Sequence, residues 1–345
     1  MKLVHAEDIM KAESPHELFS MKLELLEQEY NEYIERFKPS AYNTVRNFVV
    51  TQRVIILYRK ALSILEAREG VETSDYELRL SDENGNGITY DVHYSYDVKL
   101  GKMYVSENHV IFVVYSRYDK YYQNFIDKAY EIPKLQKKVW SKVQYSFPKI
   151  ENHFTTSSGD YAIIIKKPCR IYPLREILNY FGGWLKPEYV ASIVTRLCYF
   201  ACYMDILGLC HNGIIVDNLF FAPGRAIKEG GAFTVEDMRI VGVFGGWFFT
   251  SKVEDRIIGM PKEIYDVVPS SIKQRGTSSF VVDMLSIKRV ARELLGDTIN
   301  VPQAMKDWIN SEYIHSNAYE EYCMWEKVII QSFNKRSFVS MDISI

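Results

Sequence analysis

The fold is decided by the stretch His211-Asn212-Gly213-Ile214-Ile215-Val216-Asp217-Asn218-Leu219-Phe220-Phe221. It follows an apolar segment, residues 187–209, whose length and composition predict a helix. The last three residues, Leu219 to Phe221, predict a short buried strand. The stretch therefore predicts a polar loop between a helix and a strand, with a histidine at its start and an asparagine at its end.

Three further segments follow in order along the chain. They are Arg239-Ile240-Val241-Gly242-Val243-Phe244-Gly245-Gly246, then Met260-Pro261-Lys262-Glu263, and then Phe280-Val281-Val282-Asp283-Met284-Leu285-Ser286. The last segment leads to Glu293-Leu294-Leu295-Gly296 and predicts a helix. Each segment alone is a weak signal, but their order and spacing together indicate one fold.

Together these segments resemble the catalytic core of protein kinases, best over residues 170–300 and in outline over residues 95–335. The resemblance implies an α+β, bilobed protein-kinase-like fold with a β-rich N-lobe and a helical C-lobe. His211, Asp217 and Asn218 fall in the catalytic loop, and Phe244 with Gly245 falls in the Asp-Phe-Gly motif. The resemblance implies structural roles for Pro261, Glu263, Asp283 and His211, with Asp283 bonding the backbone of the catalytic loop.

The residues that carry out phosphoryl transfer are missing from this pattern. The aspartate that positions the substrate hydroxyl falls on Gly213, and the aspartate that holds magnesium falls on Val243. Asn212 replaces the arginine of the loop, no glycine-rich phosphate loop is present, and the strand at residues 110–115 lacks the phosphate-pairing lysine. We therefore expect no catalytic residue, no metal and no cofactor. ATP binding without magnesium is compatible with the pattern but is not expected.

Two features of the core leave alternatives open. Asp217 is either a displaced catalytic acid or, as we favour, part of a turn that caps the local backbone. The bulky run Gly246-Trp247-Phe248-Phe249 is expected to fill or order the cleft between the lobes; if exposed, it would form an apolar docking patch.

The N-terminal part predicts a separate helical hairpin. Three zones differ in composition, and we expect a helical domain at 1–70, an N-lobe at 71–168 and a C-lobe at 169–345. Apolar side chains follow helical spacing over residues 21–37 and 44–69, on either side of Lys38-Pro39-Ser40. This layout resembles a degenerate J-domain, in which only the proline of the His-Pro-Asp motif is kept. The first of these helices carries five acidic residues, Glu24, Glu27, Glu29, Glu32 and Glu35, which make it a candidate interface for a basic partner.

Composition narrows the function classes. The chain has 345 residues, a formal net charge of −2 and a sequence pI of about 6.4, so it lacks the basic character of a nucleic-acid-binding protein. A local group of lysines between residues 134 and 142 is expected to be a solvated helix face. No apolar run is long enough to span a bilayer. The sequence predicts a cytoplasmic protein, in the host-cell cytoplasm or the particle if it is viral, with no membrane, nucleic-acid or small-molecule partner.

These observations lead to one preferred function and two alternatives. The preferred function is a non-catalytic pseudokinase that serves as a protein-binding or regulatory scaffold. The first alternative is a divergent ATP-dependent enzyme that transfers a phosphoryl or nucleotidyl group. The second alternative is a structural component of a larger assembly, such as a phage particle.

Overall fold

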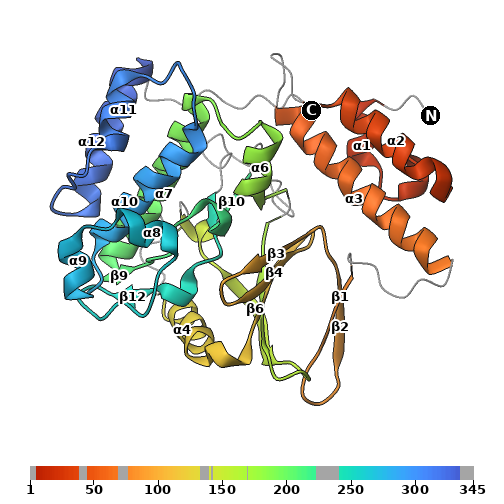
Figure 1. The fold of residues 1–345 in the computed structure, drawn as a ribbon, viewed down its shortest axis with the longest axis horizontal. Helices are drawn as coiled ribbons and strands as arrows, with labels where there is room; N and C mark the ends of the chain where they lie inside the picture. The colour runs from red at the N-terminus through yellow and green to blue at the C-terminus, as the bar shows by residue number, and fades with distance from the viewer. Residues whose placement is uncertain are drawn as a thin grey trace. The chain divides into compact units, whose positions relative to one another are not determined.

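The computed structural model describes residues 5–38, 45–68, 77–132, 140, 143–168, 170–222 and 241–334. The fold is α+β, with helices at the N-terminus, a sheet-rich region after them and a helical C-terminal part (Figure 1). The contacts divide the chain into two compact units. Unit 1 contains residues 1–117, 151–170 and 341–345, and unit 2 contains residues 118–150 and 171–340. The division into domains at 1–70, 71–168 and 169–345 stays a prediction.

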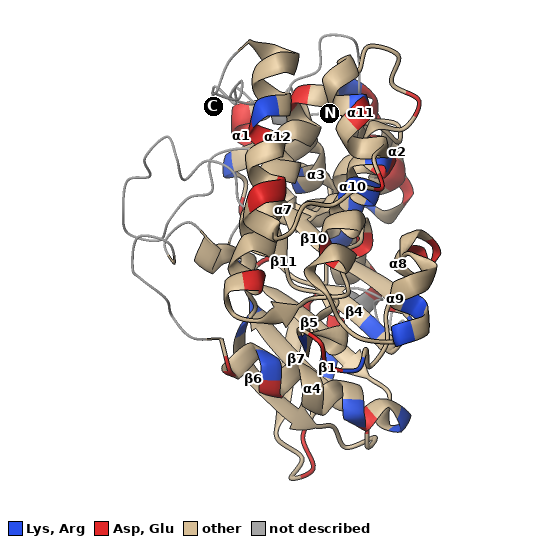
Figure 2. Ribbon diagram, turned by 90° about the vertical axis from the view of Figure 1, so that its left-hand side faces the viewer, with Lys and Arg blue, Asp and Glu red and all other residues tan. Residues whose placement is uncertain are grey.

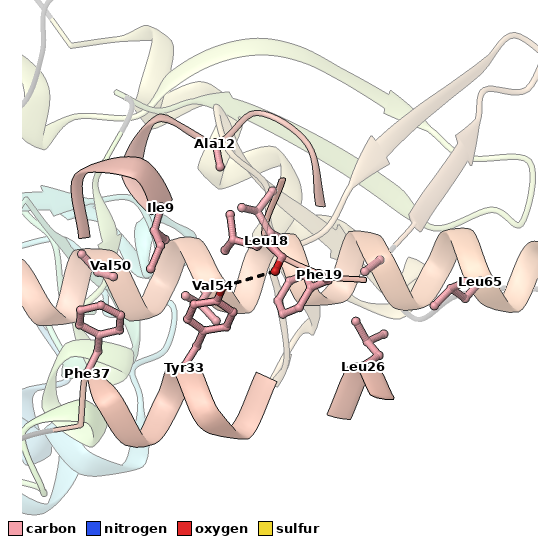
Figure 3. Close-up of a cluster of buried hydrophobic side chains, with 12 residues drawn as sticks. Ile9, Ala12, Leu18, Phe19, Leu26, Tyr33, Phe37, Val50, Val54 and Leu65 are labelled. Carbon is pink, nitrogen blue, oxygen red and sulfur yellow. Dashed lines mark hydrogen bonds between the residues drawn. The ribbon is translucent and has the colours of Figure 1, made fainter. Parts of the chain in front are cut away.

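Unit 1 begins with a helical hairpin that has its own apolar core (Figure 3). Its elements are α1 (Ala6–Lys11), the 3-10 helix η1 (Pro15–Glu17), α2 (Leu23–Arg36) and α3 (Val45–Arg68). Tyr33 on α2 is fully buried, and its hydroxyl donates a hydrogen bond to the carbonyl of Leu18. Arg53 on α3 donates to the carbonyl of Ala12 at the end of α1. The packing of α2 on α3 agrees with the helical spacing of the sequence, although Leu23 is 42% exposed instead of buried. Pro39 and Ser40 lie outside the described residues.

The sheet of unit 1 has five strands in the order β3-β4-β5-β7-β6. The strands are β3 (Tyr94–Val98), β4 (Gly101–Val105), β5 (His109–Val114), β6 (Lys149–Thr155) and β7 (Tyr161–Lys166). A separate hairpin, β1 (Glu77–Ser81) with β2 (Gly87–Asp91), packs Leu80 against Ile111 and Ile164 of the sheet. Its turn is closed by Asp82, whose carboxylate accepts hydrogen bonds from the backbone of Asn84 and Asn86.

Unit 2 is mainly helical. Its helices are α4 (Asp119–Tyr130), α6 (Leu174–Tyr180), α7 (Pro187–Ile206), α8 (Lys262–Val267), α9 (Ser270–Arg275), α10 (Phe280–Leu295), α11 (Gln303–Asn310) and α12 (Ala318–Phe333). Its short strands are β8 (Tyr172–Pro173), β9 (Leu209–Cys210), β10 (Leu219–Phe221), β11 (Val241–Val243) and β12 (Ser251–Lys252). The buried helices α7 and α10 pack against each other, and α12 covers α7. Strand β10 pairs with β8 and β11, and β9 pairs with β12, so the loop at 211–218 is anchored on both sides.

Candidate functional site

The loop from His211 to Asn218 is tied to helix α10 by Asp283. The two carboxylate oxygens of Asp283 accept hydrogen bonds of 2.8 Å from the backbone N–H groups of His211 and Asn212. Burial raises the pKa of Asp283 to about 7, against the opposing effect of these two bonds. A completely buried side chain that bonds only backbone groups sets the position of the loop and cannot reach a substrate.

His211 is an internal packing residue. Its ring is fully buried and lies edge-on to Phe200 at 5.5 Å and to Trp247 at 5.1 Å. Burial lowers the pKa of His211 to about 3. A neutral, enclosed imidazole fits the structural role that the resemblance implies.

The position to which the resemblance assigns the catalytic aspartate, Gly213, is filled by backbone. A Cβ atom at Gly213 would lie 2.7 Å from both the Cα and the carbonyl oxygen of Gly246. Conversely, a Cβ atom at Gly246 would lie 2.6 Å from the carbonyl oxygen of Gly213 and 2.7 Å from Cε1 of His211. Gly246 also has a left-handed backbone, with φ of 80°. The two glycines therefore allow two chain segments to touch where a kinase would hold its base and substrate hydroxyl.

Asn218 takes part in the same contact. Its side-chain amide donates a 2.8 Å hydrogen bond to the carbonyl of Gly213, and its backbone carbonyl accepts a 3.2 Å bond from the N–H of Gly245. A Cβ atom at Gly245 would lie 2.4 Å from Oδ1 of Asn218. The side chain of Asn218 is thus packed against the Gly245-Gly246 backbone.

The degenerate Asp-Phe-Gly segment is apolar and buried. Val243 pairs with Leu219 at the end of β11, and neither residue is exposed. Phe244 packs against Phe220 with tilted rings whose centres are 5.2 Å apart. Since a hard cation requires oxygen ligands, the Val243 side chain cannot hold magnesium.

The run that follows is also buried, so the predicted alternative of an exposed docking patch is wrong. Trp247 is fully buried, and its Nε1 donates to the carbonyl of Val243. Phe248 and Phe249, in the 3-10 helix η6 (Trp247–Phe249), are at most 5% exposed. Phe248 packs on Phe125 of α4, with ring centres 4.8 Å apart. These side chains order the chain beside the loop.

Asp217 is engaged away from the glycine contact. Arg175 of α6 donates two hydrogen bonds to the Asp217 carboxylate, of 2.7 Å and 3.1 Å, and a third of 2.7 Å to Glu293 of α10. The bonds with Asp217 raise the pKa of Arg175. A bidentate ion pair satisfies both oxygens of Asp217, which supports a structural role for this residue.

The remaining predicted residues lie elsewhere in their units. Pro261 is buried directly before α8, and Glu263 is in the first turn of that helix. The acidic residues of α2 are in the hairpin of unit 1 (Figure 2). Lys134, Lys137, Lys138 and Lys142 lie outside the described residues.

Sequence reasoning missed the residues that close the site. Arg175 and Asn124 gave no signal, because their partners are distant in the sequence. Gly246 is part of a recognisable motif, but its contact with Gly213 depends on the tertiary fold. Among the described residues, no cluster of three or more His, Cys, Asp or Glu side chains is placed to hold a metal ion. No described helix is both long and apolar enough to cross a membrane.

The β-rich region, the helical C-terminal part and the loop between β9 and β10 together define a protein-kinase-like fold. Among solved structures, that of vaccinia related kinase 3 is similar to this chain, with a TM-score of 0.55. The match covers 80% of this chain and 97% of that chain, at 12% sequence identity. At this identity the similarity shows the fold alone. No family model and no curated protein sequence matches the chain.

Proposed function

We propose that this chain is a non-catalytic protein with a kinase-like fold, which works by binding another protein. The observation that carries the proposal is the backbone contact between Gly213 and Gly246. Phosphoryl transfer requires a positioned substrate hydroxyl, a residue near it and metal ions that neutralise charge. Here a side chain cannot be added at the base position without displacing backbone, because protein interiors have little free volume.

The state of the other polar groups supports the same proposal. The carboxylate of Asp217 is occupied by Arg175, and the amide of Asn218 is occupied by the Gly213 carbonyl. A divergent transferase would have to release at least one of these groups to use it. The alternative role in a larger assembly is independent of the site and stays a prediction.

A nucleotide-binding measurement tests the proposal. We expect no rise in Tm when the protein is titrated with ATP, with or without magnesium, because the metal position is a buried valine. If ATP bound, a free ATP concentration of about 100 times its Kd would raise the free energy of unfolding by about 2.7 kcal/mol, which a thermal-shift assay detects. A protein kinase that binds ATP serves as the positive control. A Tm increase that requires magnesium would contradict the proposal; an increase without magnesium and without transfer would indicate a binding module controlled by nucleotide.

The acidic face of α2 is the partner surface that we propose. Four of its side chains are exposed, those of Glu24, Glu27, Glu32 and Glu35. The fifth, Glu29, accepts hydrogen bonds of 2.9 Å and 3.1 Å from the backbone N–H and the hydroxyl of Ser20. Glu29 therefore has a structural role. Of the exposed four, Glu35 pairs with Lys38 and Glu32 accepts a hydrogen bond from Gln28, but both contacts are at the surface and can be exchanged for a basic partner.

Neutralising the exposed face should abolish binding without affecting folding. We expect the fourfold glutamate-to-glutamine variant at 24, 27, 32 and 35 to lose the partners that the unmodified protein retains in pull-downs, with Tm nearly unchanged. The binding of those partners should also weaken with salt, because exposed charges are screened. Glu29→Gln is the matched control and should keep the partners. An unchanged set of partners in the fourfold variant would contradict this assignment.

A further inference from the structure

The segment 244–261, which connects β11 to α8, is held by neutral hydrogen bonds. Its central contact is Asn212, whose side-chain amide lies 3.0 Å from the carbonyl of Phe249 and 2.8 Å from Oγ of Ser251. The same amide lies 3.0 Å from Oγ of Ser278, just before α10. One side chain of the loop thus joins the segment to the region before α10.

Asn212 is itself fixed in place. It is fully buried, its backbone N–H is bonded to Asp283, and its φ of 55° is in the left-handed region that asparagine tolerates. An arginine at this position would need an anionic partner, such as a phosphate, to satisfy its charge. The amide of Asn212 instead binds carbonyl and hydroxyl groups, which are present in every state of the protein.

Helix α4 holds the same segment from another direction. The amide of Asn124 donates to the carbonyls of Phe248 at 3.1 Å and Thr250 at 2.9 Å. The hydroxyl of Tyr121 donates to the carbonyl of Ile258 at 3.3 Å. Strand β12 also pairs with β9, and the N–H of Val253 donates to the carbonyl of Gly208 at 2.8 Å.

We propose that segment 244–261 is locked in one conformation without phosphorylation, nucleotide or partner, and that Asn212 is the residue that positions it. The lock holds the exposed residues of this segment, Lys252 and Glu254 to Arg256, in one arrangement, so their recognition is not switched by phosphorylation. This inference goes beyond the proposed function and does not depend on it. If the protein transferred phosphate while segment 244–261 stayed rigid, the proposed function would be refuted and the lock would still hold.

Amide hydrogen exchange of peptides covering residues 247–253 tests the lock. In the unmodified protein we expect slow exchange that is unchanged by ATP with magnesium and by phosphatase treatment. Asn212→Gly removes the side-chain amide, and glycine can still adopt the left-handed backbone at this position, so the variant tests the hydrogen bonds of the amide separately from the backbone conformation. We expect these peptides to exchange at least about tenfold faster in this variant, because the buried carbonyl of Phe249 and the hydroxyls of Ser251 and Ser278 lose the amide as a hydrogen-bond partner. Asn124→Ala should accelerate the same peptides through an independent contact.

The matched control is Asn334→Gly, which alters another left-handed asparagine, with φ of 53°, at the exposed end of α12. It should leave exchange at 247–253 unchanged, and peptides from α7 report any global loss of stability in each variant. Exchange in the unmodified protein at the rate of an unstructured peptide would overturn the proposal. So would acceleration after phosphatase treatment, or unchanged exchange in Asn212→Gly.

Discussion

Replacing Gly213 with aspartate is expected to lower the free energy of unfolding by more than about 3 kcal/mol and to restore no phosphoryl transfer. The new side chain would overlap the Gly246 backbone, which has no flexible end that can move aside. It would also place a carboxylate in a buried environment. Gly213→Ala carries only the steric part of the effect, for which we expect about 1–3 kcal/mol. Urea unfolding monitored by fluorescence measures both values.

The control for this prediction is Gly87→Ala in the exposed hairpin of unit 1. A Cβ atom there would meet nothing closer than 3.8 Å, the distance to Oγ of Ser81. We expect a change within about 0.5 kcal/mol. If Gly213→Ala were as mild as Gly87→Ala, the backbone contact that closes the site would be absent.

Replacing Lys288 with methionine is expected to destabilise the protein by about 3–5 kcal/mol, because it leaves a buried carboxylate without its cation. Lys288 and Glu321 join α10 to α12 at 3.1 Å, and their side chains are 1% and 0% exposed. Lys288 also donates to the carbonyls of Ser311 and Tyr313 at 3.1 Å. Burial raises the pKa of Glu321, but the bonds from His315 and Lys288 outweigh burial and keep it below its ordinary value.

A double-mutant cycle separates the pair from its surroundings. Lys288→Met with Glu321→Leu should recover much of the lost stability, since the unpaired charge is removed with its partner. The matched surface control is Lys38→Met, whose partner is Glu35; these side chains are 60% and 70% exposed. Exposed ion pairs contribute at most about 1 kcal/mol. Equal losses for Lys288→Met and Lys38→Met would show that the buried pair is not formed.

The order of the core elements was predictable from the sequence because each element has a local pattern of apolar residues and a recognisable motif beside it. The apolar segment at 187–209 predicted α7, which ends at Ile206, and the segment around Asp283 predicted α10. The boundary between β2 and β3 was not predictable, since only Val92 and His93 separate the two strands. Strand β6 (Lys149–Thr155) was not predicted from the sequence. Alternation alone does not mark where one edge strand ends and the next begins.

The closure of the site could not be predicted from the sequence. The loss of acidic residues at Gly213 and Val243 was visible, and it indicated that catalysis was absent. What occupies the vacated position depends on a contact between glycines that are far apart along the chain. The ion pair of Arg175 with Asp217 is similarly remote, and arginine on a helix surface is too common to signal a specific partner.

A radiolabel assay tests most directly our proposal that this protein with a kinase-like fold does not transfer phosphate. The protein would be incubated with γ-labelled ATP and magnesium at high enzyme concentration, alone and with generic protein substrates, beside the Asp217→Ala variant. We expect no label on the protein or on any substrate above the level of a heat-inactivated sample. Label transferred by the unmodified protein and lost in Asp217→Ala would contradict it and would assign Asp217 as the catalytic acid.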